Sequence, residues 1–211
     1  MAKYPLFLEL KDRPVVVIGG GSIALQKAKA LQVTGARLTI VAKEICACLE
    51  ALCQQHSIPC HVAAYATHFI EEAVLVIAAT DDRTVNEQVF SDCRERRILC
   101  NVVDVPDLCD FYVPAIVRRG ALQIAIGTDG YSPAYAGQLR RKLETMITET
   151  HGEFVNNLRQ MRQVVVNDLE ESKRKDVLVK MACEESFTIF AEQGPQAWKQ
   201  YAEQLIRGMA E

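Results

Sequence analysis

The sequence lacks a long apolar run, and it lacks a strong charge of either sign. No stretch approaches the roughly 20 consecutive apolar residues that cross a bilayer, and the first thirteen residues, MAKYPLFLELKDR, lack the long apolar core of a signal peptide. The formal net charge is −3 over 211 residues, so the chain lacks the excess of positive charge that is typical of nucleic-acid-binding proteins. We therefore expect a cytoplasmic protein that binds neither a membrane nor a nucleic acid.

The sequence also has no signature of the common hydrolytic or metal-dependent enzymes. It contains no HExxH zinc-binding pattern, no phosphate-binding P-loop and no GxSxG nucleophile turn. The histidines are scattered, and none is spaced from a partner as in a catalytic triad: His56, His61, His68 and His151.

Cysteine is common, but the CxxC pairs of a structural zinc site are absent. Four of the eight cysteines lie close together in the sequence, next to His61: Cys46, Cys48, Cys53 and Cys60. This group is either a metal site of unusual spacing or a set of buried thiols that act as small apolar side chains. Nothing points to secretion, so disulfides are not expected, and metal-binding residues stay unknown.

The composition is that of an ordinary globular protein. Hydrophobic residues make up 49% and charged residues 24% of the chain. A chain of 211 residues holds one large domain or two small ones, and it can bury a sizeable core.

The strongest local pattern is the stretch PVVVIGGGSIA at residues 14–24, where an apolar run leads into three glycines and then a helical pattern. Gly19 permits a tight turn, Gly21 lets the backbone approach phosphates, and the small Ala24 lets the helix pack on the strand. The helix N-terminus offers N–H groups to an anion. The alternative is a glycine turn that binds nothing. The residues expected to hold a dinucleotide pyrophosphate are Gly19, Gly21, Ser22, Ile23 and Ala24.

Strands and helices alternate through the first half of the chain. Strands are predicted over 14–19, 37–42, 59–63, 73–78 and 98–103, and helices over 22–34, 44–55, 67–72 and 83–96. Residues 4–10, YPLFLEL, are expected to form a short strand or an arm. This alternation predicts an α/β fold with a parallel, doubly wound sheet of Rossmann type.

In such folds ligands bind at the carboxyl ends of the strands, so four loops should form one site. Cofactor contacts are expected from Thr80 and Asp81, and from Lys43 and Glu44. The acid that usually follows the second strand is replaced by Ala42. Glu44 either reaches the adenosine ribose or lies in the solvated first turn of the next helix. The positive charge of Lys43 is compatible with a 2′-phosphate, so NADP remains an alternative to NAD.

Asp104 is the carboxylate that we single out for chemistry, because it follows an apolar strand at the crevice end. A half-buried carboxylate there would have a raised pKa and exchange protons near neutral pH. The alternative is a turn residue before Val105-Pro106. Asn101 either binds a ligand or only holds this turn.

After Asp104 the pattern changes. Short apolar stretches at 111–113, 115–118 and 122–127 predict an antiparallel hairpin, and Ser132-Pro133 predicts the start of a helix over 133–149. Residues 152–211 have helical periodicity, and Gln193-Gly194-Pro195 separates the last two helices.

Two groups in this part suit an anionic substrate. The segment Gly127–Ser132 opens a helix whose N–H groups would hold a carboxylate, or it is a plain helix cap. The residues expected to bind substrate are Asn101, Thr128, Gly130 and Ser132. Four arginines either bind the anion or form a solvated face: Arg118, Arg119, Arg140 and Arg141.

The chain resembles the precorrin-2 dehydrogenases over about residues 4–150. This family includes the N-terminal module of siroheme synthase and bifunctional dehydrogenase/ferrochelatases. Three stretches carry the resemblance: YPLFLELKDRPVVVIGGGSIALQKAKALQVTGARLTIVA, VIAATDDRTVNEQV and CNVVDVPDLCDFYVPAIVRRGALQIAIGTDGYSPAYAGQLRRKLE. One difference is the GTDG segment at 127–130, where the family commonly has Ser-Ser-Gly-Gly or Ser-Thr-Gly-Gly.

The resemblance implies NAD-dependent oxidation of precorrin-2 to sirohydrochlorin, and in some members Fe²⁺ insertion to give sirohaem. It places the family's active-site Asp on Asp104. It implies an NAD-binding Rossmann domain over 1–112, a small strand-exchanging region of a homodimer over 113–150, and a helical domain over 151–211.

Two rival hypotheses remain beside this enzyme. The first is a Rossmann sensor that binds NAD(H) or a tetrapyrrole without turnover. The second is a metal-handling protein that uses residues 46–61. Formation of NADH from precorrin-2 separates the enzyme from both.

Overall fold

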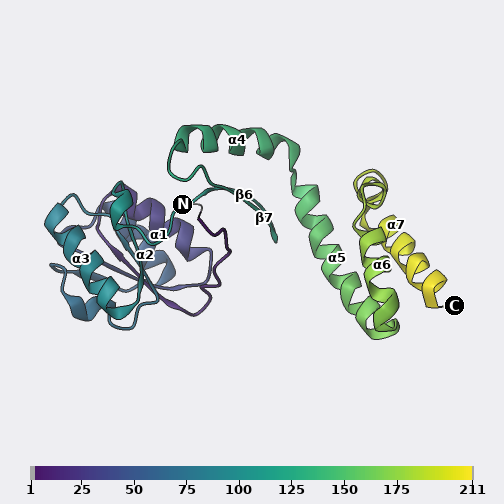
Figure 1. The fold of residues 1–211 in the computed structure, drawn as a ribbon, viewed down its shortest axis with the longest axis horizontal. Coiled ribbons are helices and arrows are strands. Elements are labelled where there is room, and N and C mark those ends of the chain that lie inside the picture. The colour runs from purple at the N-terminus through teal and green to yellow at the C-terminus, as the bar shows by residue number, and fades with distance from the viewer. Residues whose placement is uncertain (1–2, 211) are drawn as a thin grey trace. The chain divides into compact units, whose positions relative to one another are not determined.

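The computed structural model describes residues 3–210, and the chain divides into two compact units, with the boundary in the sequence between Val113 and Pro114 (Figure 1). The first unit holds the whole predicted dinucleotide fold. The second unit holds both the region expected to dimerise and the expected helical domain.

The first unit contains the predicted parallel sheet, with strand order β3-β2-β1-β4-β5. All four pairings between neighbouring strands are parallel. The strands are β1 (Pro14–Ile18), β2 (Arg37–Ala42), β3 (Cys60–Val62), β4 (Leu75–Ala78) and β5 (Leu99–Val102). The helices are α1 (Ser22–Gln32), α2 (Ala47–His56) and α3 (Arg83–Arg96), with 3-10 turns η1 (Thr67–Ile70) and η2 (Pro106–Leu108). The predicted fold class is therefore confirmed.

Alternate residues of the strands face opposite sides of the sheet, and each side has its own core. Val15 and Val17 of β1 pack in one cluster with residues of α1 and α2. Val16 and Ile18 pack in the other, with residues of α3 and η1. Both sides of β1 are buried, which explains why its sequence is a continuous apolar run.

Residues 4–10 form no strand, so of the two alternatives, a short strand or an arm, the strand is excluded. Two other predictions of local structure in this unit were wrong. Residues 111–113 form no strand, and the nearby bridge of Asn101 with Cys109 lies outside that stretch. The second helix begins at Ala47, not at residue 44, because Cys46 N–H is tied to Gly20 O at 2.9 Å.

The second unit begins with the predicted hairpin and continues as helices. The hairpin joins β6 (Ala115–Arg119) to β7 (Leu122–Ile126), and Gly120 in its turn has φ +54°. The helices are α4 (Pro133–Met146), α5 (Glu149–Asp168), α6 (Glu171–Met181) and α7 (Glu184–Ala210). Ser132 caps α4 and Pro133 is its first residue, as predicted. Gly194, at φ +87°, interrupts α7 at the predicted break.

The helices α5, α6 and α7 surround an aromatic core. Trp198 is fully buried, and its indole N–H donates to Ser186 Oγ at 2.7 Å. Phe154 packs edge-on against Trp198, with ring centroids 5.4 Å apart. No helix in the described part of the chain is long and apolar enough to cross a membrane.

Helix α4 ends at Met146, earlier than predicted, and a separate helix begins at Glu149. Thr148 and His151 form a capping box at the start of α5: Thr148 N–H donates to His151 Nδ1 at 3.1 Å. The sequence from Glu144 to Thr150 contains no glycine or proline to mark a helix end, so only the caps reveal the junction.

Candidate functional site

The glycine turn after β1 touches two neighbouring loops. Gly19 has φ +133°, and a Cβ added there would lie 2.2 Å from Ala79 O. A Cβ on Gly20 would lie 1.8 Å from Glu44 O. Gly19 and Gly20 are therefore required by packing of backbone on backbone. Sequence reasoning missed the role of Gly20, whose only signal was its place between two other glycines.

Gly21 differs from its neighbours because a Cβ added there would meet no atom within 4 Å. It is the N-cap of α1 and makes no side-chain cap hydrogen bond. The first backbone bond of the helix runs from Leu25 N–H to Gly21 O at 3.0 Å, so the N–H groups before Leu25 have no helical partner. Open space in front of free N–H groups fits a pyrophosphate.

The next residues of α1 differ in exposure, and only the packing of Ala24 was predicted from the sequence. Ala24 is fully buried and packs in the same cluster as Val15 and Val17. Ser22 is exposed, and Ile23 is 43% exposed, which is unusual for isoleucine. An apolar side chain at the mouth of the turn suits a flat, partly apolar ligand.

The loop after β2 carries Lys43 and Glu44, both exposed. Glu44 does not lie in the first turn of α2, because that helix begins three residues later. Its carbonyl packs instead against Gly20. Contact between Glu44 or Lys43 and an adenosine ribose stays a prediction.

The loop after β4 carries Thr80 and Asp81, which is exposed. Asp82 caps α3, and its Oδ1 accepts from Thr84 N–H at 3.0 Å. Thr80 is held by Asn86, a buried residue that sequence reasoning missed. Asn86 lies on the apolar stripe of α3 with Val89 and Cys93, and a lone amide on such a stripe was the available signal.

The loop after β5 carries Asp104 in the left-handed region, at φ +62°. Asp tolerates this conformation better than most residues, and such outliers cluster at functional sites. Asp104 is exposed, not half-buried as expected. The side chain lies on the turn itself, beyond the last ladder bond of β5, where nothing covers it.

Two residues hold this turn in place. The Cys109 thiol donates to Val102 O at 3.1 Å and Val105 O at 3.3 Å, the carbonyls on either side of Asp104. Burial raises the pKa of Cys109, so the thiol keeps the proton it donates. Asn101 donates through Nδ2 to Phe111 O at 2.8 Å and to Cys109 Sγ. The amide nitrogen of Asn101 therefore binds the loop, and its role toward substrate stays a prediction.

The loops of the first unit thus meet at one edge of the sheet, since all five strands are parallel. The remaining substrate candidates belong to the second unit. Thr128 Oγ1 accepts from Ser132 N–H at 3.2 Å, so these two residues shape the loop before α4. Asp129 and Gly130 both have positive φ, +57° and +83°, which gives the loop its sharp turn.

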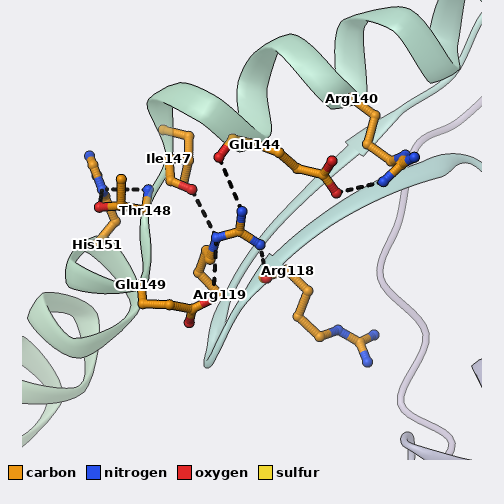
Figure 2. Close-up of polar contacts among 8 residues, drawn as sticks. All are labelled: Arg118, Arg119, Arg140, Glu144, Ile147, Thr148, Glu149 and His151. Carbon is orange, nitrogen blue, oxygen red and sulfur yellow. Dashed lines mark hydrogen bonds and ion pairs between the residues drawn. The ribbon is translucent and has the colours of Figure 1, made fainter.

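The four arginines expected to suit an anion divide into two kinds, and Figure 2 shows three of them, Arg118, Arg119 and Arg140. Arg119 binds the carbonyls of Ile147 and Glu144, and Arg140 pairs with the Glu144 carboxylate at 2.5 Å. Arg118 and Arg141 are exposed. Arg119 therefore has a structural role, and Arg118 and Arg141 are the better candidates for an anionic substrate.

The cysteine group does not assemble a metal site. No group of three or more His, Cys, Asp or Glu side chains in residues 3–210 is placed to hold a metal ion. Cys53 is buried against Cys60, while Cys48 is exposed. Burial, with the hydrogen bond to Cys60, raises the pKa of Cys53 to about 12. Cys53 thus acts as a small core side chain, and the partly buried Cys46 and Cys60 pack against the same core.

Comparison with protein families gives two matches. Residues 6–115 match the family described as putative NAD(P)-binding, and residues 119–146 match the family described as sirohaem biosynthesis protein central. Together the matches cover the nucleotide fold, the hairpin and most of α4.

Curated relatives carry the name siroheme synthase. The chain is 42% identical over 150 residues to siroheme synthase 1 of Serratia proteamaculans, covering 71% of this chain and 32% of that protein. It is 35% identical over 203 residues to the siroheme synthase of Photorhabdus laumondii, covering 95% of this chain and 43% of the relative. The chain thus spans well under half the length of these relatives.

Among solved structures, the fold is similar to SirC, described as a precorrin-2 dehydrogenase. The TM-score is 0.78 at 23% identity, and the match covers 96% of this chain and all of the other. At this identity the likeness establishes the fold.

Proposed function

The chain belongs to the putative NAD(P)-binding family, with a central segment of the sirohaem biosynthesis type, and from this we propose that it oxidises precorrin-2 to sirohydrochlorin with NAD⁺. The observation that carries the proposal is one sheet edge that presents both an open glycine turn at Gly21 and the exposed carboxylate of Asp104. The substrate is taken from the name of the structural neighbour, SirC, precorrin-2 dehydrogenase, and the curated siroheme synthases support the same biosynthesis.

The role of the first unit is to bind and orient. The N–H groups at the α1 N-terminus would hold the pyrophosphate, the open space at Gly21 would admit it, and the exposed Ile23 would offer it an apolar neighbour. Bound NAD⁺ supplies the hydride acceptor. Asp104 takes the proton that the substrate loses together with the hydride, because it is an accessible carboxylate on a turn of fixed geometry.

The role of the second unit is to bind substrate and a second subunit. Thr128, Gly130 and Ser132 would offer N–H and hydroxyl donors to the substrate's carboxylates, and Arg118 and Arg141 would add positive charge. We propose a homodimer formed through this unit. Exposed apolar side chains support it, with exposed fractions of 90% for Tyr131, 54% for Tyr135 and 59% for Met146.

The test is an anaerobic assay of the full chain with precorrin-2 and NAD⁺, followed by the near-ultraviolet absorbance of NADH. Asp104→Asn should slow NADH formation by about 100-fold or more, which is the usual contribution of a general base. The affinity for NAD⁺ should stay unchanged. The control is Asp107→Asn, an exposed carboxylate of the same loop, which should retain the wild-type rate.

Two outcomes would count against the proposal. Wild-type rates in Asp104→Asn would remove the role of Asp104. NAD⁺ binding without NADH formation would favour the sensor. A parallel arm with sirohydrochlorin and Fe²⁺ tests the insertion reaction, where Asp104 would remove pyrrole protons.

A further inference from the structure

Asn86 is a buried residue whose side-chain amide uses both its N–H donor and its carbonyl acceptor in hydrogen bonds to Thr80. Its side chain lies on the first turn of α3 and is 6% exposed. Its Nδ2 donates to Thr80 O at 2.9 Å, and its Oδ1 accepts from Thr80 Oγ1 at 2.8 Å. The two bonds close a ring that fixes both the backbone and the hydroxyl of Thr80.

This ring determines what the Thr80 hydroxyl can offer to a ligand. A carbonyl can only accept, so Nδ2 of Asn86 must face Thr80 O, and Oδ1 must face the hydroxyl. The hydroxyl therefore donates its single proton inward, where Asp82 O also lies 3.2 Å away. What remains on the outer side of Thr80 Oγ1 is a hydrogen-bond acceptor.

Thr80 lies at the point of the sheet where a dinucleotide binds. The strand order reverses between β1 and β4, and ligands of doubly wound sheets bind in the crevice at that reversal. The two turns are in contact there, since a Cβ on Gly19 would lie 2.2 Å from Ala79 O and 3.4 Å from Thr80 N. Any movement of the Thr80 turn would change the width of the crevice.

We propose that Asn86 is a positioning residue for the cofactor. It holds the Thr80 hydroxyl as an outward acceptor for a donor group of the dinucleotide, such as a ribose hydroxyl. An unesterified hydroxyl is favoured at this place, and a phosphate oxygen, which can only accept, is disfavoured. The inference rests on the proposed function and adds a residue that does not itself touch the ligand.

The competing explanation is that Asn86 only anchors α3 to the sheet. Asp92 provides the matched comparison, because it is a polar side chain of the same helix and is 5% exposed. Its oxygens accept from Tyr65, Thr67 and Gln88, away from the Thr80 turn. A structural role alone would make the two residues behave alike in NAD⁺ binding.

The experiment is calorimetric titration of the full chain with NAD⁺, with unfolding in urea measured on the same samples. Asn86→Ala and Thr80→Val should each raise the Kd for NAD⁺ about ten-fold, the size of one hydrogen bond. The double variant should lose no more than either single variant, because Asn86 acts through Thr80. Thr80→Ser should retain the wild-type Kd, and Asp92→Asn should lose stability but not affinity.

Two results would overturn the inference. One is an unchanged Kd in folded Asn86→Ala. The other is a further ten-fold loss when Asn86→Ala is added to Thr80→Val. If Asn86→Ala does not fold, the inference is tested by comparing Thr80→Val with Thr80→Ser. Equal Kd values of these two variants for NAD⁺ would exclude a role for the Thr80 hydroxyl. Absence of NAD⁺ binding by the wild type would instead remove the proposed function itself.

Discussion

Single buried polar side chains hold the loops of the first unit in place. Asn86 fixes the turn after β4, and Cys109 fixes the turn that carries Asp104. Asp92 does the same for the segment before β4: its Oδ2 accepts from Tyr65 at 2.8 Å and Thr67 at 2.7 Å. Asn86 bonds to Thr80, Cys109 to Val102 and Asp92 to Tyr65 and Thr67, and each of these bonds ties together segments that are separate in the sequence.

Asp92 should make the stability of the protein depend on pH in the acidic range. Burial works to raise the pKa of Asp92, but the hydrogen bonds from Thr67, Tyr65 and Gln88 outweigh it, and the net pKa is lowered. A lowered pKa gives stability that is present above the unfolded value, about 4, and is lost as the pH falls through the folded value. Urea unfolding at several pH values should show this loss.

The variant Asp92→Asn tests the source of this dependence. It should be less stable by about 1–3 kcal/mol near neutral pH, since one acceptor becomes a donor facing other donors. It should also lose less stability on acidification than the wild type does. Asp107→Asn, at an exposed position, should keep the wild-type profile. The same acid slope in Asp92→Asn would show that other carboxylates cause it.

The junction between α4 and α5 is held by polar contacts from Arg119 (Figure 2). Arg119, at the end of β6, donates to Ile147 O at 2.9 Å and Glu144 O at 3.1 Å, the open carbonyls at the end of α4. Its Nε also lies 3.4 Å from the Glu149 carboxylate in the first turn of α5. One guanidinium thus terminates one helix and pairs with the next.

Neighbouring arginines allow a matched test of this junction. Arg119→Met should destabilise the second unit by about 2–3 kcal/mol, because it removes two charge-assisted hydrogen bonds to backbone. Arg118→Met, at the exposed neighbour, should change stability by less than about 0.5 kcal/mol. Trp198 fluorescence during urea unfolding reports on this unit, since the only tryptophan is buried in its core. Equal effects of the two substitutions would contradict the assignment.

At the scale of the whole molecule, the two units differ in the roles expected of them. All the loops expected to hold the dinucleotide belong to the first unit, which has a core on each side of its sheet. The second unit has a separate core around Trp198. A ligand of the first unit should therefore stabilise it directly.

Gly21→Asp should separate folding from cofactor binding. The substitution fits the fold, because Gly21 has φ −87° and open space before its Cβ, but it places a negative charge in the pyrophosphate cradle. At an NAD⁺ concentration of 100 times Kd, the wild type should gain about 2.7 kcal/mol of stability, and Gly21→Asp should gain none. Thermal unfolding followed by circular dichroism measures both.

Gly208→Asp is the control, since Gly208 in α7 also has nothing within 4 Å of an added Cβ. It should keep the wild-type response to NAD⁺. Full stabilisation of Gly21→Asp by NAD⁺ would show that the glycine turn is not the binding site.

The sequence by itself determined the order and type of the main elements. Helix α3 and strand β2 have the predicted bounds, and the glycine turn falls where the pattern placed it. These features follow from apolar periodicity, glycine and capping residues, which act over a few neighbours along the chain. That is why one sequence suffices to predict them.

Only the tertiary structure decided which residues hold the site together. Three features depend on contacts with backbone groups that periodicity does not reveal. Gly20 is required because it packs against Glu44 O, and Thr80 is anchored by Asn86 through its own carbonyl. The end of α4 is bound by Arg119, which is distant in the sequence. The exposure of Asp104 depends on how its turn leaves the sheet, which no periodicity describes. Local patterns determine what each segment becomes, and close contacts between distant segments determine which side chains are left free to act.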